Sequence, residues 1–198
     1  MPRQRYQKKS LSPTQRKEVK KLVMAPMEKK NFPWFYQDLD ITDVHNISNI
    51  TAIPQGDGEA ERDGDSVKIT GTYGRGAIIV GDGFNMVRLT LIRWKCNGEP
   101  TAAQIYDLTN IGTNGSMYSP FNHNYRDQFV VLQDKFINLD TYNPYKQVII
   151  KAGPQPKTTY NAGAITGINK IYMILSSDST VGPHPKITFR ADTHYVDC

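Results

Sequence analysis

Alternation of apolar and polar residues over short runs constrains the fold of this chain more than any other feature of its sequence. The clearest run is NMVRLTLIRWKC at residues 85–96, where Val87, Leu89 and Leu91 alternate with Arg88 and Thr90. Successive side chains of a β-strand point to opposite faces, so a period of two predicts a strand with one face toward a core. Similar runs recur after Asn31 between clusters of turn residues. We expect strands at residues 34–41, 66–80, 85–96, 127–139, 145–152, 157–160, 167–177 and 185–196.

Eight strands with no alternating helices predict an all-β domain, either an antiparallel sandwich or a barrel. The sequence GDG at 81–83 predicts a tight turn between two of these strands. The one long segment without strand character is 97–126, where TAAQIYDL at 101–108 predicts a short helix. The sequence contains no internal repeat, and a body of about 165 residues can bury a core without disulfides or metals. We therefore interpret residues 31–198 as one domain.

Positive charge is concentrated at the start of the chain. The whole sequence contains 24 Lys and Arg against 19 Asp and Glu. Residues 1–30 hold ten of these bases and two of the acids, a net charge of +8. Residues 31–198 keep the other fourteen bases and seventeen acids, a net charge of −3. This asymmetry indicates that residues 1–30 are a basic N-terminal arm that binds a polyanion.

A short helix is predicted inside this arm. Ser12 is placed to cap it, Pro13 suits the first helical position, and Gln15 completes a capping box. The helix should run over about residues 13–24, and residues 1–11 should be disordered in the free chain. A helix of about 12 residues is marginal in water, so it needs a partner. Its apolar stripe is expected to bundle with other copies, and consists of Val19, Leu22 and Val23.

The basic side of the arm is the candidate nucleic-acid interface, because phosphate binding requires concentrated cations and no particular sequence. The predicted binding residues are Arg3, Arg5, Lys8, Lys9, Arg16, Lys17, Lys20, Lys21, Lys29 and Lys30. Tyr6 is the only aromatic residue of the arm, so base stacking should contribute little there. Two plainer interpretations stay open, namely a solubilising tail and a nuclear import signal at QRKEVKK, residues 15–21.

No motif for catalysis or metal binding is found. The acidic loop PQGDGEAERDGD at 54–65 departs from the EF-hand template, with Arg62 at the sixth position and Lys68 at the twelfth, so a solvated loop is the favoured interpretation. The four histidines have no paired-ligand spacing. The glycine-rich stretch GTYGRG at 71–76 favours a bulge or kink in a strand. We therefore expect neither enzyme activity nor a metal site.

The cellular setting is indicated by what the sequence lacks. Cys96 and Cys198 are the only cysteines, too few for a disulfide framework or a zinc cluster, and we interpret both as free thiols in a reducing compartment. No stretch approaches the roughly 18 apolar residues of a membrane span, and the N-terminus has no apolar signal segment. We expect no membrane insertion.

Several segments taken together resemble the coat proteins of small icosahedral viruses. IPQGDGEAERDGDSVKITG at 53–71 resembles their Q-G-…-R-x-G-D-x-[VI]-x-I stretch, and NMVRLTLIRWK at 85–95 resembles their next strand. YSPFNHNYRDQFVVLQDKFINL at 118–139 resembles their S-P-[FY]-N-…-F-x-V-L-x-D-K segment. INKIYMILSSD at 168–178 and ITFRADTHYVD at 187–197 resemble their last two strands. The resemblance covers nearly the whole chain. It is to coat proteins of circular Rep-encoding single-stranded DNA (CRESS-DNA) viruses, in the branch similar to satellite tobacco necrosis virus.

This resemblance implies a single eight-stranded antiparallel viral jelly roll of two four-stranded sheets, assembled as sixty copies into a T=1 icosahedral shell. It implies an arm that points inward, with its helix bundled about a threefold axis and its cations on the packaged single-stranded DNA. The protein would then occur in the virion, and in the host nucleus or cytoplasm during assembly. A host receptor and a nuclear import factor are the further partners implied.

The resemblance also bears on metal ions and on contacts between copies. Coats of the satellite-virus kind bind calcium at subunit junctions, and the acids at 57–65 are the candidate Ca²⁺ ligands here; no other cofactor is implied. The 97–126 segment is where we expect subunit contacts or outer-surface features.

Two other functions are compatible with an antiparallel sandwich. One is a non-viral jelly-roll binding module that is histone-chaperone-like or lectin-like. The other is a cupin-type enzyme, which requires a cluster of His and Glu on adjacent strands that the sequence does not offer. Particle size distinguishes these functions, because a shell indicates a coat protein, whereas a pentamer, trimer or monomer indicates a binding module.

Overall fold

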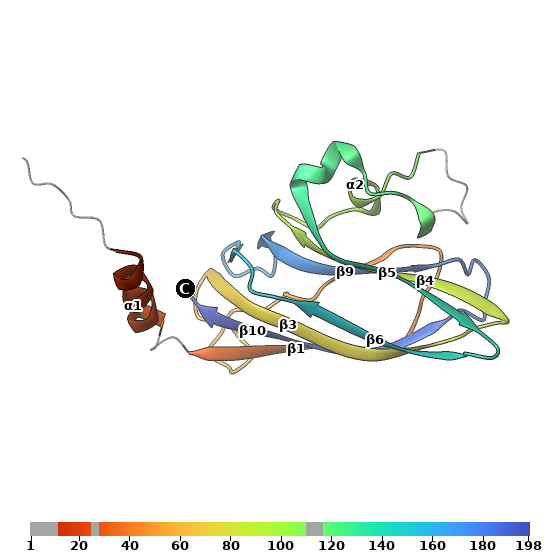
Figure 1. Cartoon of the computed structure of the whole chain (residues 1–198), viewed down its shortest axis with the longest axis horizontal. Coiled ribbons are helices and arrows are strands. Elements are labelled where there is room, and N and C mark those ends of the chain that lie inside the picture. Colours follow the sequence, from red (N-terminus) through yellow and green to blue (C-terminus); the bar gives the residue numbers. More distant parts are fainter. Residues whose placement is uncertain (1–11, 25–27, 110–116) are drawn as a thin grey trace, which may run out of the picture.

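Two antiparallel β-sheets packed face to face make up the body of the chain (Figure 1). The computed structural model describes residues 12–24, 28–109 and 117–198, and over 19–24 it describes the backbone alone. The larger sheet contains β1 (Lys29–Asp40), β3 (Ser66–Ile79), β6 (Tyr145–Ala152), β7 (Lys157–Tyr160), β8 (Gly167–Ile168) and β10 (Lys186–Asp197). The smaller sheet contains β2 (Asn46–Asn49), β4 (Phe84–Trp94), β5 (Phe129–Asp140) and β9 (Lys170–Ser177). The predicted all-β antiparallel fold is confirmed.

The strand order brings distant parts of the sequence together. In the larger sheet β1, β10 and β3 lie side by side, so the first and last strands are neighbours. The 14-residue β3 pairs with β6 over Thr72–Ile79 and with β7 over Ser66–Lys68, and β8 extends the sheet beyond β7. The order in the smaller sheet is β2-β9-β4-β5. The chain passes from one sheet to the other several times, and a core lies between the facing sheets.

The prediction of eight strands in two four-stranded sheets is wrong in detail. The described residues contain ten strands, in sheets of six and four. The alternation pattern does not predict β2, because Asn46–Asn49 contains only one apolar residue. In the structure all four of its residues are half-buried. The expected strand 167–177 is divided into β8 and β9 by Asn169, whose φ of 59° is in the left-handed region that Asn tolerates.

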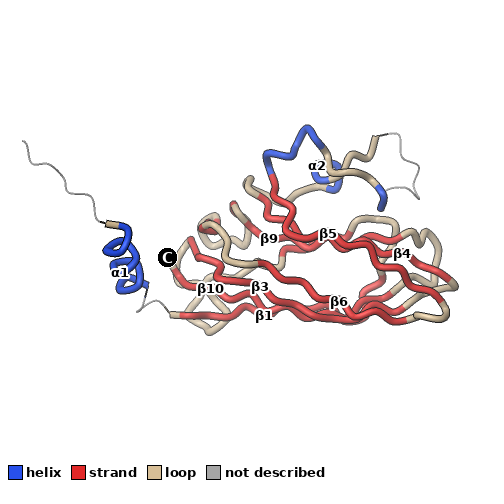
Figure 2. Tube along the Cα trace, viewed as in Figure 1, coloured by secondary structure: helices blue, strands red, loops and turns tan. Residues whose placement is uncertain are grey.

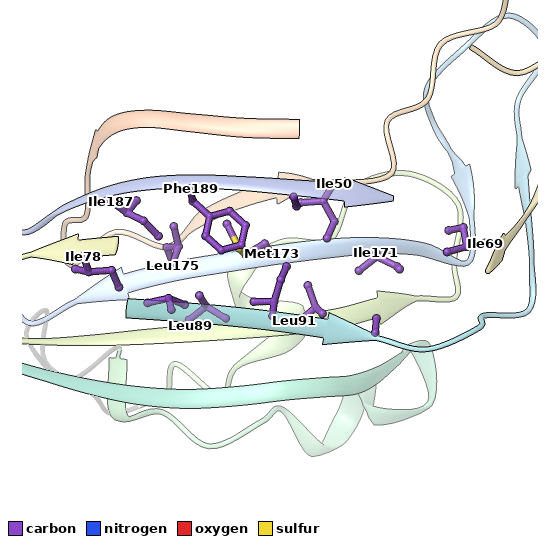
Figure 3. Close-up of a cluster of buried hydrophobic side chains, with 14 of the residues drawn as sticks. Ile50, Ile69, Ile78, Leu89, Leu91, Ile171, Met173, Leu175, Ile187 and Phe189 are labelled. Carbon is purple, nitrogen blue, oxygen red and sulfur yellow. The ribbon is translucent and has the colours of Figure 1, made fainter. Parts of the chain in front are cut away.

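The main core lies between the two sheets, as Figure 3 shows. The inward residues of β4, Val87, Leu89 and Leu91, are fully buried, as their alternation predicted. They pack in one cluster with inward residues of the other strands, among them Ile69, Ile78, Ile171, Met173, Leu175, Ile187 and Phe189. Full burial of one such side chain contributes about 1.5–3 kcal/mol, so this cluster is the main source of stability.

The outer face of the smaller sheet is covered by the segment that follows β4. This segment carries α2 (Ala102–Ile105) and a 3₁₀ helix at His123–Gln128, both of which lie over the β4-β5-β9 side of the sandwich (Figure 2). Ile105 and Tyr106 are fully buried there and form a second core with Ile92, Trp94 and Ile174. Every residue of β9 is consequently buried. Both faces of β9 and most of β4 are therefore buried, whereas β5 keeps exposed residues.

The predicted arm helix is confirmed as α1, Pro13–Met24. The helix begins at the capping box that the sequence predicts. The backbone amide of Gln15 donates to Ser12 Oγ at 3.2 Å, and the backbone amide of Ser12 donates to Gln15 Oε1 at 3.0 Å. The predicted short helix in 101–108 is confirmed as α2. No helix within the described ranges combines the length and the apolar character that a membrane span requires.

Candidate nucleic-acid interface

The structure describes only part of the predicted interface on the arm. Arg16 and Lys17 lie in the first half of α1 and are exposed to solvent. The capping box fixes the start of α1 just before Arg16 and Lys17, so their side chains lie about one turn from the N-terminal end of this helix. Arg3, Arg5, Lys8 and Lys9 lie outside the described residues, as do the side chains of Lys20, Lys21, Val19, Leu22 and Val23. Their assignment to nucleic-acid binding and to helix bundling stays a prediction.

The last two predicted cations belong to the body and have different environments. β1 begins at Lys29, and Lys29 is exposed. Lys30 is buried, with its Nζ 2.6 Å from Asp63 Oδ1 and 3.3 Å from Asp197 Oδ2. The hydrogen bond that Lys30 donates to Asp63 is the main reason that the pKa of Lys30 is raised above its usual value. Lys30 therefore ties β1 to the 54–65 loop and to the end of β10, and we leave it out of the nucleic-acid interface.

Three of the five acidic side chains of the loop 54–65 contact other groups of the protein. Asp63 pairs with Lys30, and Asp65 lies 3.4 Å from the guanidinium of Arg62. Glu61 accepts a hydrogen bond of 2.8 Å from the amide of Gly58, within the loop. Within 12–24, 28–109 and 117–198, no group of three or more His, Cys, Asp or Glu is placed to hold a metal ion.

Arg62 and Lys170 form a buried cationic cluster around one aromatic ring. Arg62 Cζ and Lys170 Nζ each lie 4.3 Å from the centre of the Tyr160 ring. The Arg62 guanidinium also donates to the carbonyls of Ile53 at 3.3 Å and Ala164 at 2.8 Å. Lys170 Nζ is buried without a hydrogen-bond partner in the part of the chain that the structure describes. Burial, and next the charge of Arg62, lower the pKa of Lys170 to about 8.

Replacing Lys170 by Met is expected to stabilise the protein at pH 7 by about 1–2 kcal/mol, since an unpaired buried ammonium costs free energy that a thioether does not. The pKa of Lys170 is about 8 in the fold against 10.5 as the reference value. Between these pH values the unfolded chain holds more protons on Lys170 than the folded chain, so the stability advantage of Lys170→Met over the natural protein should shrink as the pH rises. Urea denaturation from pH 7 to 10 measures both effects.

The matched control for this substitution is Lys157→Met, because Lys157 is exposed on β7. It should change the free energy of unfolding by less than about 0.5 kcal/mol. A Lys170→Met protein that is less stable than the natural one at pH 7, by a margin that does not change toward pH 10, would show that the ammonium is stabilised in the fold.

A second basic region, which the sequence did not reveal, lies on the outward face of the larger sheet. Arg75 of β3 and Arg190 of β10 are directly paired in the strand register, and both are exposed. Phe35 of β1 is the neighbour of Arg190 on its other side. The adjacent row across the sheet contains Asp192 of β10, Tyr73 of β3 and Lys151 of β6. The alternation of β3 and β10 indicated outward polar residues, but not that the two arginines meet.

Two hollows flank the arginine pair on this face. One has a volume of about 670 Å³ and is bordered by Phe35 and Tyr145, with the small residues Gly76 and Ala77 between them. The other, of about 390 Å³, is lined by Tyr73 and Asp192. Arg75 and Arg190 line both hollows. The face thus presents a pair of guanidinium groups between two recesses, each of which is bordered by an aromatic ring.

Comparison with known proteins does not place this chain in a family. No family model matches the chain, and no curated protein matches it. Among solved structures, a chain from the structure titled Desmodium yellow mottle tymovirus is similar, with 12% sequence identity and a TM-score of 0.41. The alignment covers 87% of this chain and 89% of that chain. At this identity and TM-score the match is a similarity only, and it assigns no family.

Proposed function

We propose that this chain is a viral coat protein, in which copies of the β body assemble into a closed shell and the basic arm packages single-stranded nucleic acid. The observation that carries the proposal is the strand order. The four-stranded sets β1-β10-β3-β6 and β2-β9-β4-β5 face each other, with first and last strands adjacent, and this order is consistent with a double-sheet jelly roll. The short strands β7 and β8 are then an addition at one edge.

Charge separation gives the proposal its mechanism. The residues before the body, 1–24, hold eight of the 24 Lys and Arg and one Glu, a net charge of +7, and the other 174 residues have a net charge of −2. A cationic arm on a nearly neutral shell former concentrates positive charge in one enclosed volume when many copies assemble. Each phosphate contact releases a counterion, so many weak arms can hold a genome together.

The more specific parts of the proposal come from the sequence resemblance. We propose a T=1 shell of sixty copies, a circular single-stranded DNA genome, and residence in the virion after assembly in the host nucleus or cytoplasm. The segment QRKEVKK at 15–21 suits nuclear import, since its cations lie in the exposed first half of α1 and just beyond it. We propose no catalytic role, and calcium remains a candidate ligand only where subunits meet.

The test is the particle that the purified full-length chain forms. Sixty copies of a 22.4 kDa chain give a shell of about 1.3 MDa before nucleic acid is added. We expect hollow particles of uniform diameter by electron microscopy and a single boundary of at least that mass by sedimentation. Nuclease treatment before extraction identifies the protected nucleic acid. A stable monomer, trimer or pentamer over a range of salt and pH would instead indicate a jelly-roll binding module.

A further inference from the structure

We propose that the outward face of the β1-β10-β3-β6 sheet holds a second nucleic-acid site, built on Arg75 and Arg190 and separate from the N-terminal arm. Its ligand is a short stretch of single-stranded nucleic acid, with a phosphate between the two guanidinium groups and a base in each flanking hollow. This inference rests on the proposed function, in which the body lies next to packaged single-stranded nucleic acid.

The arginine pair is the first observation behind this site. Like charges directly opposite each other on neighbouring strands destabilise a sheet, yet Arg75 and Arg190 are direct partners in the register. Arg190 has one acidic partner, Asp192, at 3.5 Å, and that carboxylate also accepts from Asn31 at 3.3 Å. Arg75 makes no ion pair within the described ranges of the chain. Among the described residues, only one of the two guanidinium groups therefore has an acidic partner, and a phosphate is the ligand that a guanidinium fork binds well.

The aromatic residues are the second observation. Phe35, Tyr145 and Tyr73 are 69%, 58% and 40% exposed, although large aromatic residues usually bury most of their surface. They border the two hollows on either side of the arginine pair. Lys151 Nζ lies 5.6 Å from the centre of the Tyr73 ring and adds another cation beside it. Exposed aromatic rings between cations are the usual composition of surfaces that bind single strands without sequence preference.

The size of the hollows agrees with this ligand. Volumes of about 670 and 390 Å³ fall within the range of small-molecule sites, so each can accept a single unpaired base. The larger hollow is lined by the small residues Gly76 and Ala77 together with the exposed rings of Phe35 and Tyr145. A Cβ on Gly76 would lie 2.3 Å from the Thr188 carbonyl oxygen, so β3 approaches β10 closely here. Sequence preference should be weak, because the site combines stacking and charge.

The decisive experiment compares two double variants of the full-length chain in binding a fluorescent ten-nucleotide oligothymidylate. Arg75→Gln with Arg190→Gln removes the proposed site, and Arg126→Gln with Lys157→Gln removes the same charge from exposed positions elsewhere. Loss of the one phosphate contact should lower the slope of log affinity against log salt by about 0.7 and weaken binding roughly fivefold at 0.1 M salt. The control should bind like the natural protein.

Photo-cross-linking supplies an independent readout that does not require the arginine variant to fold. An oligonucleotide carrying 4-thiothymidine should form adducts with peptides that contain Tyr73 or Tyr145 in the natural protein. Tyr73→Leu with Tyr145→Leu should abolish those adducts while leaving the salt slope nearly unchanged, since the phosphate contacts remain. Adducts confined to residues 1–24 would overturn the proposal. Equal salt slopes for the natural protein and for the Arg75→Gln, Arg190→Gln variant would also overturn it.

These outcomes separate the site from the coat-protein function. Shells that carry nucleic acid but give adducts only in the arm would refute the site and leave the coat function intact. Adducts at Tyr73 on a chain that never forms shells would support the site and refute the coat function. If the Arg75→Gln, Arg190→Gln protein loses shell formation and the natural protein gives no adducts on this face, the face is a contact between copies, and the site is refuted.

Discussion

Particles formed by a chain without residues 1–24 are expected to carry at least tenfold less nucleic acid per subunit than particles of the full chain. The deletion removes eight cations and one acid and leaves a body of net charge −2, which cannot neutralise a packaged polyanion. In a sixty-copy shell it removes about 480 cationic groups from one cavity. The deletion ends at Met24 because β1 begins at Lys29 and Lys30 is buried, so the folded body is kept whole. The measurements are the ratio of absorbance at 260 and 280 nm and the nuclease-protected nucleotide per subunit.

Two variants of the full chain show which property of the arm is responsible. Replacement of Arg16, Lys17, Lys20 and Lys21 by Gln removes half of the eight cations and should reduce packaged nucleotide about in proportion, because counterion release follows charge. Replacement of Val19, Leu22 and Val23 by Ser keeps every charge and should leave the nucleotide content near normal while weakening helix bundling. Deletion particles that retain the nucleic acid of full-length particles would show that the body alone packages it.

Local signals in this sequence predicted local structure well. The pattern Ser12, Pro13, Gln15 placed the start of α1 at the correct residue, because a capping box involves only residues within one turn. The alternation in residues 85–96 identified the face of β4 that packs in the main core, because a pleated strand separates its two faces by a period of two. Both signals depend on the nearest neighbours in the chain, and both survive in the folded molecule.

Contacts between distant segments were not predictable from the same patterns. Arg88 alternates with apolar residues and looked solvent-facing, yet it is buried because the 97–126 segment folds over the smaller sheet. Lys30 looked like part of the basic arm, but Asp63 and Asp197 fix it in the body. Arg75 and Arg190 come from strands far apart in the sequence, and only the register of β3 with β10 makes them neighbours. These three outcomes depend on tertiary pairing, which single-residue patterns do not encode.

The substitution Asp134→Ala is expected to destabilise the protein by about 3–5 kcal/mol, because it leaves a buried guanidinium without its counter-charge. Arg88 Nε and Nη2 donate to the two oxygens of Asp134, each at 2.9 Å, and the Arg88 side chain is only 4% exposed. Arg88 Nη1 donates to the carbonyls of Met117 at 3.0 Å and Ser119 at 2.6 Å. The pair therefore joins β4 and β5 to the segment that covers them, and urea denaturation measures its loss.

The physical cause of that loss can be isolated with a second variant, Arg88→Met with Asp134→Leu. Removal of both charges leaves no unpaired ion. The free energy of unfolding of this variant should therefore lie within about 1–2 kcal/mol of that of the natural protein, even though the ion pair is lost. Asp127→Ala is the surface control, since Asp127 is exposed in the 3₁₀ helix before β5. It should change stability by about 0.5 kcal/mol at most. If Asp134→Ala lowers the free energy of unfolding no more than this control does, water or another group compensates the charge of Arg88. The 97–126 segment is then held on the smaller sheet by the second apolar core alone.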